Sequence, residues 1–285
     1  GDAGDSQQFK QFLEHPLTVL VHVFLHVHAS KVQPRPTHTY LRGPVRALAT
    51  MSQSPLPRFN DTAQAFQHLT DVELRRAIGL FSLIGKPWLV GVGSALANLA
   101  LALRIPIGWA VRPTVYGHFC GGESIDDSEA TIAKLAAHNV RTILDYSAEG
   151  QTAEADLDAT CSEVLATIQA ADGDARHAFA VFKVSGLSSN ALLEKVGRAL
   201  AGRTTLNSDE EAAWNRVQRR VRTLCEATSA AGGRVMIDAE ESWIQDAIDA
   251  LAEDMMSDYN RDQVVVYNTV QMYRHDRLAY LKAMA

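Results

Sequence analysis

The sequence predicts an α/β protein in which short parallel strands alternate with helices. Three observations lead to this prediction. Past Pro113, short apolar runs alternate with longer stretches of helical periodicity, and this rhythm implies parallel strands joined by right-handed crossovers. Several of these runs end in polar or ionisable residues, as strands do at the carboxyl edge of such a sheet. The chain has 285 residues, 47% of them hydrophobic, which is enough to bury a sizeable core.

The charge of the chain favours a small-molecule partner. The formal net charge is −6 at pH 7. No dense block of lysine and arginine stands against this acidic background, which argues against nucleic acid as a partner. The arginines at positions 216, 219, 220 and 222 are interpreted as an exposed helix face rather than an anion site.

The cysteines and histidines predict no metal site. Cys120, Cys161 and Cys225 are widely spaced and form no CxxC pair, so we interpret them as reduced core thiols. Of the histidines near the amino terminus, His22, His26 and His28 lie among valine, leucine and phenylalanine with no acidic or cysteine neighbour, and His15 has only Glu14 beside it. Metal ligation is therefore not expected at either set.

Residues 1–60 are predicted to form an N-terminal leader. Residues 15–60 contain no aspartate or glutamate but several arginines among serine, threonine and proline, a composition typical of an organellar transit segment. An unstructured leader, or read-through upstream of a start at Met51, also fits this composition. A transit segment predicts a mitochondrial location, whereas a start at Met51 favours the cytoplasm of a bacterium.

Residues 61–112 are predicted to be a helical region. Thr70-Asp71-Val72-Glu73 matches a capping box, and the apolar residues around it follow helical spacing. The run from Trp88 to Leu103 is almost wholly apolar, but a helix that spans a bilayer needs about 20 such residues. We interpret this run as a buried or membrane-touching helix, so peripheral contact with a membrane is one expectation.

Residues 113–285 carry the alternation of strands and helices. Predicted strands are short runs rich in valine, isoleucine or aromatic residues, and predicted helices show helical periodicity or acidic first turns. The strands are predicted over 114–123 with a glycine turn, 140–146, 177–184, 234–239 and 263–271. The helices are predicted over 125–139, 154–171, 188–231 and 243–259, with a last helix starting near His275. About five strands are thus expected, whereas a closed (β/α) barrel needs about eight.

The ends of the predicted strands are the candidate functional site. Asp145, Lys183, Asp238 and Gln271 each lie where a strand is expected to stop. Side chains alternate along a strand, so Asp238 and Glu240 share one face. Charged groups in a low-dielectric mouth need to be paired with one another or with a ligand. We therefore predict function at this edge, with a purely structural ion-pair network as the alternative.

Five consecutive motifs resemble those of the FAD-dependent proline dehydrogenases. The resemblance runs from about Ala77 to Ala285, and the order and spacing of the motifs are kept. The motifs are Phe119-Cys120-Gly121-Gly122-Glu123, Ile143-Leu144-Asp145-Tyr146-Ser147-Ala148-Glu149-Gly150, Ala180-Val181-Phe182-Lys183, Ile237-Asp238-Ala239-Glu240-Glu241-Ser242-Trp243-Ile244-Gln245 and Tyr267-Asn268-Thr269-Val270-Gln271-Met272-Tyr273.

The resemblance implies a distorted (β/α)8 barrel of the proline dehydrogenase type, with FAD at the carboxyl ends of its strands. Such an enzyme oxidises L-proline to Δ1-pyrroline-5-carboxylate and passes electrons to a quinone, on the matrix side of the mitochondrial inner membrane. By the same resemblance, Lys183 lies near the flavin and helps to neutralise the substrate carboxylate, and Asp238 supports that site. Gln271 matches a hydrogen-bond donor to the flavin ring, and Asp145 matches an aspartate behind the lysine.

The sequence also departs from the family. A later-strand motif under the flavin has no counterpart, nor do a tyrosine and an arginine pair of the last helix. We therefore expect the chain to lack the carboxyl-terminal half of the barrel and to be inactive alone. Two other functions remain open: a Schiff-base lyase with Lys183 as its amine nucleophile, and a non-catalytic fragment or interaction protein.

Overall fold

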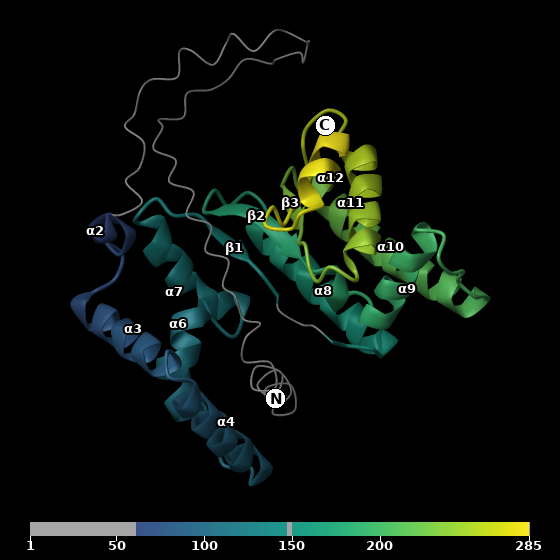
Figure 1. Cartoon of the computed structure of the whole chain (residues 1–285). Helices are drawn as coiled ribbons and strands as arrows, with labels where there is room; N and C mark the ends of the chain where they lie inside the picture. Colours follow the sequence, from purple (N-terminus) through teal and green to yellow (C-terminus); the bar gives the residue numbers. More distant parts are fainter. Residues whose placement is uncertain (1–60, 147–149, 285) are drawn as a thin grey trace, which may run out of the picture. The chain divides into compact units, whose positions relative to one another are not determined.

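The computed structural model describes residues 61–146 and 150–284, and the predicted leader over 1–60 lies outside them (Figure 1). The described residues form two compact units. We call residues 121–133 and 141–284 the sheet unit, and residues 61–120 and 134–140 the helical unit.

The sheet unit contains a four-stranded parallel sheet. Each strand is hydrogen-bonded to the next one in sequence: β1 (Thr142–Leu144), β2 (His177–Phe182), β3 (Val235–Ile237) and β4 (Val266–Asn268). A parallel sheet whose order never reverses places its crossover helices on one face, because each crossover is right-handed. The predicted α/β class with parallel strands is therefore confirmed.

Helices connect these strands (Figure 1). They are α7 (Ile125–Ala136) before β1, α8 (Glu154–Ala171) before β2, the 3-10 turn η3 (Val184–Gly186), α9 (Asn190–Leu200) and α10 (Ser208–Ala230) before β3, α11 (Gln245–Tyr259) before β4, and α12 (Arg277–Met284). In the sheet unit, α11 packs against α9 and β4, and α10 packs against α8. The single helical region predicted over 188–231 is two helices, because the loop between them contains Gly202 with a left-handed backbone, φ 69°.

The two faces of the sheet differ in burial. On one face, alternate residues of β2, β3 and β4 are buried and join one hydrophobic cluster with the helices: Ala180, Phe182, Val235, Ile237 and Val266. On the other face, Val181, Met236 and Tyr267 align in register and are only half-buried. The Phe179 and Tyr267 rings meet there edge to face, with 5.1 Å between their centroids. We call this second side the half-buried face.

Two of the three cysteines belong to the core. Cys161 on α8 and Cys225 on α10 are buried, and burial raises the pKa of the Cys225 thiol to about 12. Cys120 is half-buried. The interpretation of Cys161 and Cys225 as core thiols is confirmed.

The interpretation of the α10 arginines as an exposed face is wrong at one position. The Arg220 side chain is only 7% exposed. It forms ion pairs with Glu154 and Asp158 at the start of α8, and its guanidinium also donates to the Leu187 carbonyl oxygen at 3.1 Å. Arg220 is therefore a buried link between α10, α8 and the end of η3, where its charge is compensated by two carboxylates.

The helical unit begins with α2 (Thr62–Ala65) and α3 (Asp71–Ile84). The predicted capping box at the start of α3 is confirmed, because the Glu73 amide donates to Thr70 Oγ1 at 3.3 Å and the Thr70 amide donates to Glu73 Oε2 at 2.7 Å. The unit continues with α4 (Pro87–Ala102), α5 (Gly108–Val111), the π-helix η2 (Arg112–Tyr116) and α6 (Gly117–Phe119).

The apolar run predicted over 88–103 forms most of α4. In the described part of the chain, no single helix is long and apolar enough to cross a membrane, and α3 and α4 meet those criteria only as a pair bent by 95°. The sequence predicts that this run is either buried or in contact with a membrane. Burial is wrong for one side of it, since Trp88, Leu96 and Leu103 are 67%, 61% and 63% exposed.

The strand predicted over 114–123 is wrong, so the described residues hold four strands rather than five. That segment forms η2 and α6. Pro113 lies in the first turn of η2, where a missing N–H is tolerated and the fixed φ favours a helix. The His118 and Phe119 rings pack edge to face on Phe81 of α3, with centroids 5.2 and 6.2 Å away. Packing against α3 thus overrides the strand preference of Thr114-Val115-Tyr116.

Candidate active site at the carboxyl edge of the sheet

The parallel ladder continues one residue beyond the ends of β2, β3 and β4. The Asp238 amide donates to the Phe182 carbonyl oxygen at 3.0 Å, and the Thr269 amide donates to the Ile237 carbonyl oxygen at 3.2 Å. Lys183 has extended backbone angles, φ −102° and ψ 135°. Lys183, Asp238 and Thr269 therefore form the next rung and project from the half-buried face, as strand alternation predicts.

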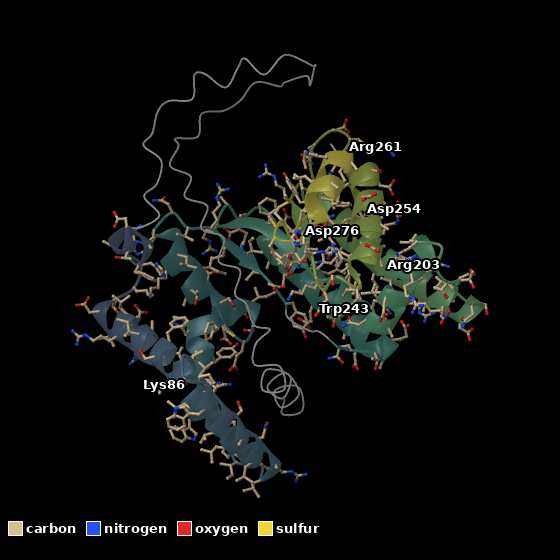
Figure 2. All side chains as sticks on the ribbon, in the orientation of Figure 1. Lys86, Arg203, Trp243, Asp254, Arg261 and Asp276 are labelled. Carbon is tan, nitrogen blue, oxygen red and sulfur yellow. The ribbon has the colours of Figure 1, made fainter. Side chains whose placement is uncertain are left out.

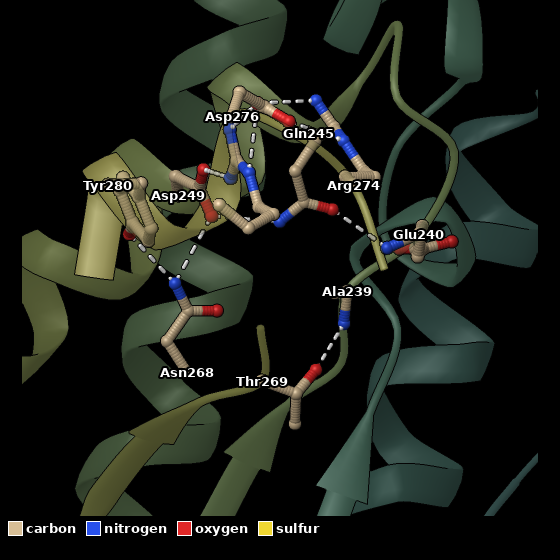
Figure 3. A network of polar contacts seen from close by, with 10 residues as sticks. Ala239, Glu240, Gln245, Asp249, Asn268, Thr269, Arg274, Asp276 and Tyr280 are labelled. Carbon is tan, nitrogen blue, oxygen red and sulfur yellow. Dashed lines mark hydrogen bonds and ion pairs between the residues drawn. The ribbon is translucent and has the colours of Figure 1, made fainter. Parts of the chain in front are cut away.

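Asp238 is held by its neighbour on this rung. Thr269 Oγ1 donates to Asp238 Oδ1 at 3.0 Å. The same hydroxyl accepts a hydrogen bond from the Ala239 amide at 2.6 Å (Figure 3). The Ala239 amide is also 3.1 Å from Asp238 Oδ1. One carboxylate oxygen of Asp238 is thereby fixed by the strand on one side of it.

Glu240 ties the loop after β3 to the turn after β2. Its carboxylate accepts hydrogen bonds from the Ser185 amide, at 3.0 Å, and from Ser185 Oγ. The Glu240 amide in turn donates to Gln245 Oε1 at 2.8 Å. Ser185 is 3% exposed and Gln245 is 1% exposed, so both tethers are shielded from water. The β3 loop is thus attached to the turn after β2 and to the start of α11.

A buried polar network stands behind this loop (Figure 3). Gln245 Nε2 donates to Asp249 Oδ1 at 2.8 Å, and Asn268 Nδ2 donates to the same oxygen at 3.1 Å. The other carboxylate oxygen of Asp249 pairs with Arg277. Asn268 also donates to the Tyr280 hydroxyl at 2.9 Å, and burial raises the pKa of that phenol. Behind the strand-end row, Asp249 and Arg277 thus form a buried ion pair.

The structure brings the remaining sequence-predicted residues to the same edge. Gln271 is half-buried beyond β4, and its Nε2 donates to the Ala239 carbonyl oxygen at 3.4 Å. Asp145 is exposed just beyond β1. Lys183 is half-buried at the start of η3. Together with Asp238, these residues bring an ammonium, two carboxylates and an amide to four neighbouring strand ends.

Sequence reasoning missed three residues that organise the site: Thr269, Ser185 and Gln245. Strand alternation places Thr269 on the same face as Gln271, and Ser185 on the same face as Lys183. The sequence therefore predicts where these two hydroxyls lie, but a hydroxyl alone does not indicate what it contacts. Gln245 lies on α11, away from any strand end. Its link to Glu240 depends on tertiary packing that the sequence does not display.

The donor set at this edge fits a flavin ring. An isoalloxazine has carbonyl and ring-nitrogen acceptors along one side and broad apolar faces, so it requires donors next to an apolar surface. The Lys183 ammonium and the Gln271 amide are donors, and the half-buried face with Met236 and Tyr267 is the adjoining apolar surface. Two hollows of about 310 and 430 Å³ lie among the outer helices, and neither is lined by these residues.

Comparison with known proteins gives a consistent result. The family model described as proline dehydrogenase matches residues 128–285. The carbapenem antibiotics biosynthesis protein CarD of Pectobacterium carotovorum subsp. carotovorum is 33% identical over 163 residues, which cover 57% of this chain and 42% of CarD. Proline dehydrogenase 1, mitochondrial, of Dictyostelium discoideum is 24% identical over 215 residues, covering 64% of this chain and 38% of the relative.

Other matches are more distant. Proline dehydrogenase 1, mitochondrial, of Arabidopsis thaliana is 22% identical over 258 residues, covering 76% of this chain and 52% of the relative. The crystal structure of proline utilization A from Bdellovibrio bacteriovorus, inactivated by N-propargylglycine, superposes with a TM-score of 0.45 and 15% identity. That superposition covers 57% of this chain and 18% of the other. The chain spans 38% to 52% of the length of these three curated relatives.

Proposed function

The chain belongs to the proline dehydrogenase family. On this premise we propose that it serves in the FAD-dependent oxidation of L-proline to Δ1-pyrroline-5-carboxylate. We propose that the electrons pass to a quinone. The observation that carries the proposal is the row Lys183, Asp238 and Thr269 on the half-buried face of the sheet. We further propose that the four strands are an arc of a (β/α)8 barrel in the working enzyme. Their sequential order supports this, since an open doubly wound sheet reverses its order.

Lys183 is proposed to bind the substrate carboxylate. Its ammonium stands on the half-buried face, where an approaching anion gains more from a cation than it would in bulk water. The next strand presents Asp238 on the same rung, and the backbones of neighbouring strands lie about 4.8 Å apart. We propose that Asp238 orients the lysine and compensates its charge when no substrate is bound, and that Asp145 does so from the other side.

Gln271 and Lys183 are proposed to hold the flavin. The Gln271 amide is anchored to the Ala239 carbonyl oxygen by one N–H, and it keeps a second N–H for an acceptor of the ring. When bound, the flavin would supply the hydride acceptor for the carbon beside the amine nitrogen. The residues of this chain supply the position and the electrostatics: they orient the carboxylate end of proline and fix the ring relative to it.

A substitution at Lys183 tests the proposal. In a chain extended to a complete barrel and loaded with flavin, Lys183→Met should raise KM for proline in a dye-reduction assay by about tenfold or more, because a charge-assisted hydrogen bond contributes about 1.5–3 kcal/mol. Lys183→Arg keeps the cation and should retain much of the affinity. A carboxylate-bearing proline analogue that perturbs the flavin spectrum gives a second readout, which does not require turnover. Equal affinity for the analogue in the parent and Lys183→Met would refute the assignment.

A mitochondrial location is proposed as well. Two of the relatives described above carry mitochondrial in their names, whereas CarD is bacterial. Residues 1–60 fused to a fluorescent reporter should reach mitochondria in a eukaryotic cell, because acid-poor, arginine-containing segments are imported. Diffuse cytosolic fluorescence would instead favour a bacterial cytoplasmic protein.

A further inference from the structure

One side of α4 is an exposed apolar surface. The helix contains no ionisable residue. Its exposed large side chains recur every three or four residues, and so they lie along one side of the helix. We call these residues the α4 surface; they are between 52% and 67% exposed: Trp88, Val92, Leu96, Leu99 and Leu103, the last just beyond the helix. Figure 2 shows the α4 side chains standing out from the ribbon beyond Lys86.

Neighbouring segments extend this apolar character. At the end of α3, Leu83 and Ile84 are 55% and 42% exposed, and after α4 the side chains of Ile105 and Trp109 are 50% and 80% exposed. A helix that is apolar on all sides is normally buried in a protein core or a membrane. A soluble surface rarely leaves contiguous large apolar side chains uncovered, and where it does they mark a site of interaction.

The charge around this surface identifies its partner. From Leu74 to Gly122 the sequence contains no aspartate or glutamate, although the whole chain has a net charge of −6. The same stretch contains five lysines and arginines: Arg75, Arg76, Lys86, Arg104 and Arg112. Lys86 and Arg104 bracket α4. An uncharged helix bordered only by cations is complementary to acyl chains beneath anionic headgroups.

We propose that the α4 surface docks into the interface of an anionic lipid bilayer, with the helix lying along the membrane. Sixteen residues make a helix about 24 Å long, shorter than the hydrocarbon core of about 30 Å. The 95° bend turns α3 away from the axis of α4, so the two do not form one straight span. Trp88 and Trp109 are exposed near the two ends of the segment, where tryptophan prefers the headgroup level.

A second copy of the chain is a poorer partner for this surface. A two-fold symmetric dimer would place the α4 surface against itself. Lys86 and Arg104 at the two ends of the surface would then face cations of the other copy, and α4 itself contributes no acidic residue to compensate them. An anionic bilayer removes this repulsion and accepts the apolar side chains at the same time.

Flotation with lipid vesicles tests the proposal. The purified chain should rise with vesicles that contain phosphatidylglycerol in phosphatidylcholine, and much less with phosphatidylcholine alone. Raising the salt concentration should weaken binding, because exposed charges are screened. Flotation separates bound protein from aggregates, which sediment. The assay measures no turnover, so its outcome is independent of the proposed oxidation of proline.

Variants locate the contact. Leu96→Gln with Leu99→Gln, and separately Lys86→Glu with Arg104→Glu, should each lower partitioning by about tenfold or more. Leu200→Gln is the matched control, since Leu200 is 60% exposed but lies on α9. Circular dichroism checks that each variant keeps its helices. Flotation of the Leu96 and Leu99 variant equal to that of the parent would overturn the proposal. So would a parent that fails to float and instead forms a dimer which this variant dissociates.

Discussion

Replacing Thr269 by valine removes a hydroxyl from the strand-end row while nearly conserving side-chain shape. In the parent, this hydroxyl donates to Asp238 Oδ1 at 3.0 Å and accepts from the Ala239 amide at 2.6 Å. In the variant, the Asp238 carboxylate loses its donor on β4. The Ala239 amide keeps only the 3.1 Å contact with Asp238 Oδ1. We expect a less stable protein in which Asp238 is no longer held against the neighbouring strand.

The size of the effect follows from the two bonds. A hydrogen bond to a charged group contributes about 1.5–3 kcal/mol, and one between neutral groups about 0.5–1.5 kcal/mol. Thr269 and Asp238 are both half-buried rather than fully enclosed, so water replaces part of each bond. The lower end of each range therefore applies, and together they predict a loss of about 2 kcal/mol in the free energy of unfolding.

Urea denaturation followed by circular dichroism measures this loss. Thr269→Ser is the matched control, because it retains the hydroxyl and removes one methyl group, worth less than about 1 kcal/mol at a half-buried position. The serine variant should therefore be more stable than the valine variant. If valine is as stable as serine or more so, the hydroxyl does not hold Asp238 as described.

Two further predictions concern the packing and the electrostatics of the sheet unit. A Cβ on Gly122 would stand 2.6 Å from the Ser128 amide nitrogen, so Gly122→Ala should destabilise the protein by about 1–3 kcal/mol. The control is Gly121→Ala, whose Cβ meets nothing closer than 3.7 Å and should be tolerated. Thermal unfolding compares the two variants, and equal melting temperatures would contradict the reasoning. A hydrogen bond from Arg216 lowers the pKa of Glu154 from 4.5 to about 2, so its contribution to stability is complete above pH 4.5 and is lost as the pH falls toward 2. Stability measured at steps of pH across this window should fall less steeply in Glu154→Gln, and parallel curves would show that the pair contributes nothing.

Sequence alone places Lys183 and Asp238 on one face of the sheet, because that placement depends only on alternation along a strand. The structure adds that the ladder continues through Asp238 and Thr269, so both strands keep this parity beyond the ends of β3 and β4. The start of α3 was equally accessible, since its capping box, Thr70 with Glu73, involves residues three positions apart.

The rest depends on contacts that the sequence does not display. Asp249 and Arg277 lie 28 positions apart, and their pairing depends on tertiary structure that includes the packing of α11 against β4. Arg220 resembled a surface arginine because its partners lie on α8, more than sixty positions away. The segment before Cys120 has the composition of a strand, and the packing of the His118 and Phe119 rings on Phe81 helps to explain why it is helical.

The tethers around the β3 loop make its positions genetically interdependent. Glu240 depends on Ser185 of the preceding strand end, and Ala239 depends on Thr269 of the following one. A change at one of these positions leaves a polar group of another without its hydrogen-bond partner. The effect of the change therefore depends on which residues the other positions carry. Double-mutant cycles among Ser185, Glu240 and Thr269 should therefore be non-additive. An evolving sequence would have to alter this edge in linked steps, even though the positions span more than eighty residues of chain.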